Sequence, residues 1–122
     1  MKVLHSFGYA LTGIAVGLKE RNMRIHVLLT GIVFFFGYFF SITKLEWIAI
    51  IVCIGFVMAC ELFNTALEKL GDIVTTINPG AYNPMGDVKN LAAGSVFVSA
   101  LTSLFVAIII FLPHFVQVFF TL

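Results

Sequence analysis

The stretch WIAIIVCIGFVMAC, residues 47–60, contains no charged residue, and ELFNTALEKLGD, residues 61–72, follows it with three acids. A helix running on from residue 47 to residue 70 is long enough to cross a hydrocarbon layer, which needs about 20 residues. The preceding TKLE, residues 43–46, has the Ser/Thr-x-x-Glu form of a capping box, which predicts a helix start at Thr43. The stretch therefore predicts a membrane-spanning helix over about 45–70 whose last turns carry polar groups.

Two further apolar runs lie on either side of this helix. The run at 25–42 contains no acid, Lys or Arg, and the run at 91–112 is uncharged throughout. Each is close to the length of about 20 residues that crosses the bilayer core. The turn-forming sequence NPGAYNP at 78–84 separates the last run from the helix before it. We expect a single domain over 1–122, all-α, with spans over about 25–42, 45–70 and 90–112.

The N-terminal segment, residues 3–19, differs from the three spans. Its apolar side chains recur at three- and four-residue spacing, which predicts an amphipathic helix lying in the membrane surface. The basic residues indicate orientation, because they are enriched in cytoplasmic segments of membrane proteins. Only Lys44 lies on the far side of the predicted bundle, and six basic residues lie on the N-terminal side: Lys2, Lys19, Arg21, Arg24, Lys69 and Lys89. We expect the N-terminus and a 71–90 loop in the cytoplasm.

The composition excludes several classes of protein. Hydrophobic residues make up 61% of the chain and charged residues 11%, whereas soluble domains carry roughly a quarter charged residues. This excludes an ordinary soluble domain. The formal net charge of +1 implies no nucleic-acid partner. Both cysteines, Cys53 and Cys60, lie inside an apolar run, which excludes a secreted disulfide framework.

The acids after residue 60 form a stripe. At 100° per residue, Glu61, Asn64, Glu68 and Asp72 fall within an arc of about 80° on one helix face. Glu61 lies near or just inside the membrane boundary, where an unpaired carboxylate is unfavourable. Such a stripe can bind a divalent cation, accept a proton from a hydroxyl or carry protons in a transporter. The spacing alone does not choose among these functions.

Two more polar groups lie at predicted helix ends. KERNMRIH, residues 19–26, precedes the first span, and its Lys and Arg residues are ordinary interfacial anchors. Anchoring explains neither Glu20 nor His26, although a lone interfacial histidine is more often structural than catalytic. In DVKNLAAG, residues 87–94, Lys89 lies beside the free N–H groups of a helix start, where a phosphate can bind. A snorkelling lysine would occupy the same position.

These groups, in this order, resemble the prokaryotic diacylglycerol kinase family of small membrane lipid kinases. The matching motifs are F-x-Y-A-x-x-G at 7–13, E-x-N-x-x-x-H at 20–26, E-x-x-N-T-A-x-E-x-x-x-D at 61–72 and K-x-L-A-A-G-x-V at 89–96. The likeness covers nearly the whole chain. The form at 20–26 looks more like the undecaprenol kinase branch of the family.

The resemblance implies a kinase of the bacterial inner membrane that transfers the γ-phosphate of MgATP to the hydroxyl of undecaprenol or diacylglycerol. It implies a homotrimer with active sites between subunits, which we also expect because three helices alone should not enclose Glu61 from lipid. Glu61 matches the catalytic base, and Glu20 and Glu68 match the carboxylates that bind Mg²⁺. The positions that match nucleotide-binding residues are Tyr9, Glu20, Asn64, Glu68, Asp72, Lys89 and Asn90.

One position departs from the family pattern. Asn90 stands where the family usually has aspartate, and an amide brings no charge to nucleotide or metal binding. A non-catalytic relative is therefore one alternative. A small proton-coupled transporter is the other, although the acids gather at one membrane face and no inverted repeat is visible.

Overall fold

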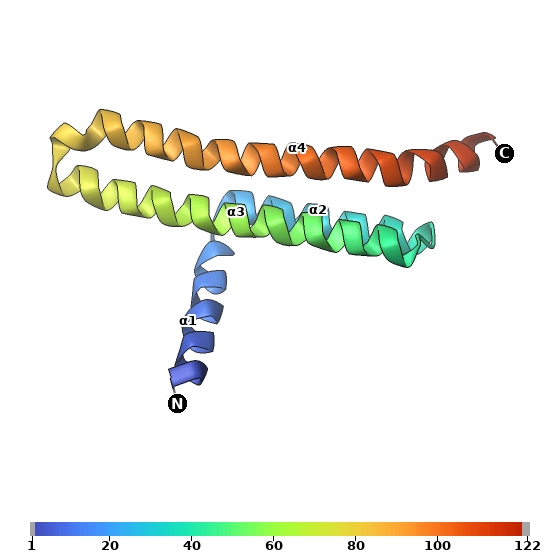
Figure 1. The fold of residues 1–122 in the computed structure, drawn as a ribbon, viewed down its shortest axis with the longest axis horizontal. Helices are drawn as coiled ribbons and strands as arrows, with labels where there is room; N and C mark the ends of the chain where they lie inside the picture. The colour runs from blue at the N-terminus through green and yellow to red at the C-terminus, as the bar shows by residue number, and fades with distance from the viewer. Residues whose placement is uncertain (1, 121–122) are drawn as a thin grey trace.

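The computed structural model describes residues 2–120, which are helical almost throughout (Figure 1). Lys2, one of the basic residues used for the orientation, has a side chain outside the described part. No strand occurs within residues 2–120, so the all-helical class is confirmed. The elements are α1 (Lys2–Gly17), α2 (Arg21–Phe39), α3 (Lys44–Ile77), the 3₁₀ turn η1 (Pro79–Ala81) and α4 (Tyr82–Phe120).

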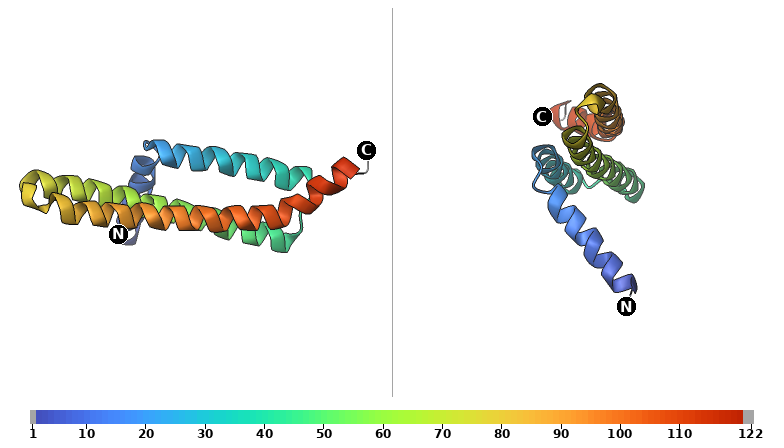
Figure 2. Two further views of the ribbon diagram at one scale, coloured as in Figure 1. Left: turned by 90° about the horizontal axis from the view of Figure 1, so that it is seen from above. Right: turned by 90° about the vertical axis from the view of Figure 1, so that its left-hand side faces the viewer.

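Three of the helices, α2, α3 and α4, are each long and apolar enough to cross a membrane, as the sequence predicts. α3 and α4 lie antiparallel and side by side, and α2 packs beside the half of α3 that begins at Lys44 (Figures 1 and 2). α1 leaves this bundle where α2 begins and runs across its long axis (Figure 1). This is the arrangement expected of a surface helix attached to spanning helices.

The two long helices extend beyond the predicted spans. The expected loop at 71–90 is wrong, because α3 continues to Ile77 and α4 begins at Tyr82. At about 1.5 Å per residue α3 is about 51 Å long, whereas the hydrocarbon core is about 30 Å thick. Hydropathy indicates where the apolar part of a helix ends, but the helix itself can continue past that point, as α3 does. At the other end, α4 continues through Pro113 to Phe120, past the predicted end at residue 112.

A tight turn joins α2 to α3. The Thr43 hydroxyl accepts a hydrogen bond from the Glu46 N–H, and the Glu46 carboxylate accepts one from the Thr43 N–H, so the predicted capping box is confirmed. Ser41 adopts a φ of 52°, and the Ile42 N–H donates to the Gly37 carbonyl at 3.2 Å, which ends α2 in a Schellman-type turn. This turn sets the register of α2 against α3.

The apolar core lies at the same end of the bundle as this turn. Its buried members are Ile42, Ile50, Ile110 and Phe111. Aromatic rings of α2 and α4 pack around it, with the Phe40 and Phe115 ring centres 4.8 Å apart. The largest buried apolar cluster therefore lies in this half of the bundle, whereas the buried polar side chains Glu61, Asn64, Thr65 and Ser99 lie outside it.

Candidate active site

The polar stripe of α3 forms the centre of the candidate site. Glu61 is only 1% exposed and Asn64 is 5% exposed, although the preceding part of the helix is apolar. The Asn64 side-chain amide donates a hydrogen bond to Glu68 Oε1 at 3.0 Å. Glu61 Oε2 and Asn64 Oδ1 are buried without a hydrogen-bond partner among the residues the structure describes. Buried acceptors are rarely left unpaired, so these two oxygen atoms can accept hydrogen bonds from water or from a ligand, or bind an ion.

The beginning of α2 closes a small cavity against this stripe. The cavity has a volume of about 110 Å³. Its lining residues are Glu20, Arg21, Asn22, Glu61, Asn64, Thr65 and Glu68. The fold thus brings three carboxylates from two distant segments to one cavity, including the predicted pair Glu20 and Glu68.

Burial of Glu61 corrects one step of the sequence argument. Three helices were expected to leave this carboxylate open to lipid, but a single chain already shields it almost completely. The shielding comes from the beginning of α2, where Asn22 lines the cavity and Met23 is buried. The burial of Glu61 is therefore no argument for a trimer.

An ion pair ties the beginning of α2 to α3. Lys69 Nζ lies 3.1 Å from Glu20 Oε1, and the two side chains are 54% and 38% exposed. Ion pairs as exposed as this contribute little to stability, about 1 kcal/mol or less. Glu20 can therefore exchange Lys69 for a cation at little energetic expense.

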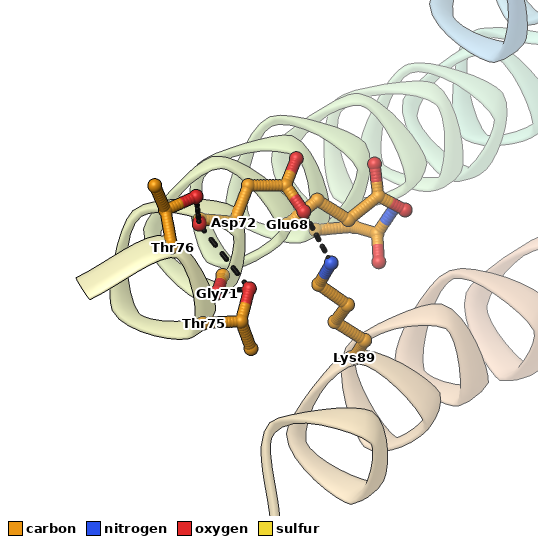
Figure 3. Close-up of polar contacts among 7 residues, drawn as sticks. Glu68, Gly71, Asp72, Thr75, Thr76 and Lys89 are labelled. Atoms are coloured by element: carbon orange, nitrogen blue, oxygen red, sulfur yellow. Dashed lines mark hydrogen bonds and ion pairs between the residues drawn. The ribbon is translucent and has the colours of Figure 1, made fainter. Parts of the chain in front are cut away.

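Lys89 reaches the same stripe from α4. Its ammonium donates a hydrogen bond to Asp72 Oδ1 (Figure 3). The backbone carbonyl of Asp72 accepts hydrogen bonds from the hydroxyls of Thr75 and Thr76. The structure therefore pairs Lys89 with Asp72, one helical turn beyond Glu68, a contact that the sequence analysis did not specify.

Four predicted residues do not line the cavity: Asp72 and Lys89, which pair with each other one turn beyond Glu68, and Tyr9 and Asn90, which lie further away. Tyr9 lies on α1 and is 77% exposed. Asn90 lines a different groove of about 890 Å³, between α3 and α4, together with Cys60 and Asp87. A single chain thus does not assemble every position that the motifs select.

The donor set of the cavity fits Mg²⁺. This ion prefers oxygen ligands and usually takes one or two protein carboxylates, with waters and phosphate oxygens completing its shell. Glu20 and Glu68 supply two carboxylates, and Glu61 and Asn64, each of which has one unpaired buried oxygen atom, are lining residues of the same cavity. Within residues 2–120, no three acids, histidines or cysteines come close enough to hold a metal alone. An ion here would need ligands from the substrate.

An apolar groove, which the sequence did not indicate, lies next to this cavity along the bundle. It has a volume of about 220 Å³ and lies between α2, α3 and α4. His26 and Val57 line it, each one helical turn deeper than the cavity residues Asn22 and Glu61. Small side chains of α4, Ala100 and Ser103, also line it. Three separate helices build this groove from common apolar residues, so no local sequence pattern marks it.

Comparisons with known proteins agree with these motifs. Residues 8–111 match the family model described as prokaryotic diacylglycerol kinase. The chain is 34% identical over 110 residues to a protein named undecaprenol kinase from Bacillus subtilis, covering 88% of this chain and 86% of that protein. It is also 34% identical over 117 residues to a protein named diacylglycerol kinase from Synechocystis, covering 91% of this chain but only 63% of that longer protein. No solved structure matches the chain.

Proposed function

The chain belongs to the prokaryotic diacylglycerol kinase family of multi-pass membrane lipid kinases, and we propose that it transfers the γ-phosphate of MgATP to the hydroxyl of undecaprenol or diacylglycerol. The observation that carries this proposal is the cavity in which the buried Glu61 lies with Glu20 and Glu68. It combines a candidate base with candidate metal ligands beside an apolar groove.

Glu61 acts as the general base in this proposal. Its Oε2 has no hydrogen-bond partner within residues 2–120, so it is available to accept the proton of the lipid hydroxyl. The lipid oxygen then bonds to the γ-phosphorus, the bond from that phosphorus to the bridging β–γ oxygen breaks, and ADP leaves. Phosphoryl transfer depends chiefly on positioning and on charge neutralisation.

Glu20 and Glu68 would hold Mg²⁺, which neutralises charge on the β- and γ-phosphates when it is bound. Lys89 supplies a further positive charge from α4, suited to a phosphate oxygen. Asn64 and Asp72 lie on the same face of α3 and complete the nucleotide side of the site. In this proposal Glu20, immediately before α2, and Glu68 on α3 bind the metal. Asn64 and Asp72 on α3 and Lys89 on α4 bind the nucleotide.

The apolar groove offers a place for the lipid chain. Because it begins one helical turn inward from Glu61, a chain lying in it would leave its hydroxyl at the carboxylate. α2 packs chiefly on α3 rather than on α4, so the groove between α2 and α4 can be entered from the side. His26 lies at the polar end of this path.

We further propose that the enzyme is a homotrimer in the bacterial inner membrane. Tyr9 and Asn90 lie away from the cavity of their own chain, which supports a site completed by a neighbouring subunit. Lys69 and Lys89 pair with residues at the end of the bundle where α2 begins, and Lys44 lies at the other end. This asymmetry favours a cytoplasmic location for η1 and the N-terminus.

A direct assay tests the proposal. The purified protein is incubated with radiolabelled ATP and Mg²⁺ in mixed micelles that contain undecaprenol or diacylglycerol. We expect label in the lipid fraction with one or both lipids. Absence of labelled lipid with both would contradict the proposal and favour the non-catalytic or transporter alternatives.

Asn90 lies outside the cavity, so its missing charge leaves Glu61 and the candidate metal ligands in place.

A further inference from the structure

Gly71 lies on α3 directly under the side chain of Lys89. A Cβ atom on Gly71 would lie 2.7 Å from Lys89 Cε and 3.2 Å from Met85 Cε. Carbon atoms in ordinary contact are about 3.5–4.0 Å apart. Figure 3 shows the Lys89 side chain extending from α4 toward α3, with Gly71 and Asp72 beside its end. A side chain at position 71 would therefore displace the end of the Lys89 side chain from its present path.

The backbone does not require glycine at this position. Gly71 is within α3, and no glycine among residues 2–120 has a positive φ. Inside a helix, glycine is less favourable than alanine because it loses more backbone freedom on folding. What remains to explain this glycine is the space that it leaves for Lys89.

We propose that Gly71 is a positioning residue for Lys89, and that the gap above it lets the ammonium reach the polar stripe of α3 and bind a nucleotide phosphate there. This inference rests on the proposed function. A lysine is a point charge on a flexible four-carbon stem, so the surface against which the stem packs decides where the charge lies. At this site the surface is the bare backbone of α3 at Gly71, bordered by Met85.

Lys89 pairs with Asp72 in the structure, and this ion pair is compatible with a role in phosphate binding. The Asp72 carboxylate accepts a hydrogen bond from the Lys89 ammonium. Because the Asp72 side chain is 71% exposed, a phosphate oxygen can take the place of this carboxylate without leaving a buried charge unpaired. Lys89 is thus held near its working position before the nucleotide binds.

The variant Gly71→Ala should move Lys89 rather than unfold the protein. The atoms that its methyl group would meet are the far ends of two flexible side chains, not backbone. We expect the dissociation constant for a non-hydrolysable ATP analogue with Mg²⁺ to rise about tenfold, the scale of one weakened charged hydrogen bond. The KM for ATP should rise similarly and the KM for the lipid should not change.

Gly86→Ala is the matched control. It makes the same chemical change in α4, close to Lys89 in sequence, where a Cβ would meet no described atom within 4 Å. Nucleotide binding by this variant should equal that of the wild type. Thermal unfolding of both variants separates loss of fold from loss of binding.

A double-mutant cycle with Lys89→Ala decides between positioning and a merely structural role. If Gly71 acts through Lys89, Gly71→Ala should have no further effect on nucleotide binding once Lys89 is alanine. A full additional loss in that background, or unchanged binding by Gly71→Ala alone, would overturn the proposal. Because the analogue is not hydrolysed, the cycle is read even if no lipid is phosphorylated. Absence of lipid phosphorylation would refute the kinase assignment, but it would leave the positioning role of Gly71 intact.

Discussion

Removing the negative charge of Glu20 or Glu68 tests the candidate metal site most selectively. The variants Glu20→Gln and Glu68→Gln keep the size of the side chain but remove its charge. Glu68→Gln also keeps a carbonyl oxygen that can accept the 3.0 Å hydrogen bond from Asn64. Each variant therefore reports on the charge rather than on packing around the cavity.

The expected effect is on the Mg²⁺ requirement. Loss of one charged ligand is expected to weaken binding by about 1.5–3 kcal/mol, which corresponds to a roughly 10- to 100-fold higher Mg²⁺ concentration at half-maximal activity. In the double variant the loss of Mg²⁺ affinity should be much smaller than the sum of the losses in the two single variants, because both residues hold the same ion.

The ion pair with Lys69 makes the two variants unequal. Glu20→Gln leaves the Lys69 ammonium without its partner at the edge of the cavity, which adds repulsion toward the cation. Since Lys69 is 54% exposed, this addition should be under about 1 kcal/mol, or less than about fivefold. Adding Lys69→Met to Glu20→Gln should recover the part of the Mg²⁺ affinity that is lost through repulsion from the Lys69 ammonium.

The assay is a Mg²⁺ titration of lipid phosphorylation at saturating total ATP for each single variant and the double variant. Glu46→Gln is the matched control. Its carboxylate belongs to the capping box at the opposite end of α3, so the Mg²⁺ dependence should not change although the free energy of unfolding falls by about 1 kcal/mol. An unchanged Mg²⁺ requirement in both single variants would refute the metal site.

Three further predictions concern the nucleotide, the lipid and the assembly. Lys89→Ala should weaken nucleotide binding about tenfold or more at every Mg²⁺ concentration, whereas Lys44→Ala should not; equal effects would point to a general loss of charge. Ala100→Phe, which fills the apolar groove, should raise the KM for the lipid about tenfold and leave nucleotide binding intact; an unchanged KM would place the lipid elsewhere. Chemical crosslinking in mild detergent should yield trimers, and monomers alone would argue against the composite site.

The sequence predicts the polar stripe well because a helix has a fixed period. Glu61, Asn64 and Glu68 share a face at any helix position, and the stripe lies in the structure as expected. The capping box at Thr43 was equally predictable, since it depends on residues only three apart.

Other features depend on distances between helices, which no local pattern contains. The extension of α3 to Ile77 lies past the apolar run, where hydropathy no longer marks a helix. Shielding of Glu61 depends on where the beginning of α2 lies against α3. The space at Gly71 exists only because α4 passes close enough for Lys89 to cross it.

The role of Glu61 as the base is the centre of the account, and Glu61→Gln tests it most directly. The amide is nearly the same size, cannot accept the proton, and carries no charge to be buried, so the fold should be retained. Lipid phosphorylation should fall by about 10²- to 10⁴-fold, while the ATP analogue binds as to the wild type. Turnover close to the wild-type rate, with nucleotide binding unchanged, would contradict the assignment and leave Glu61 a structural residue.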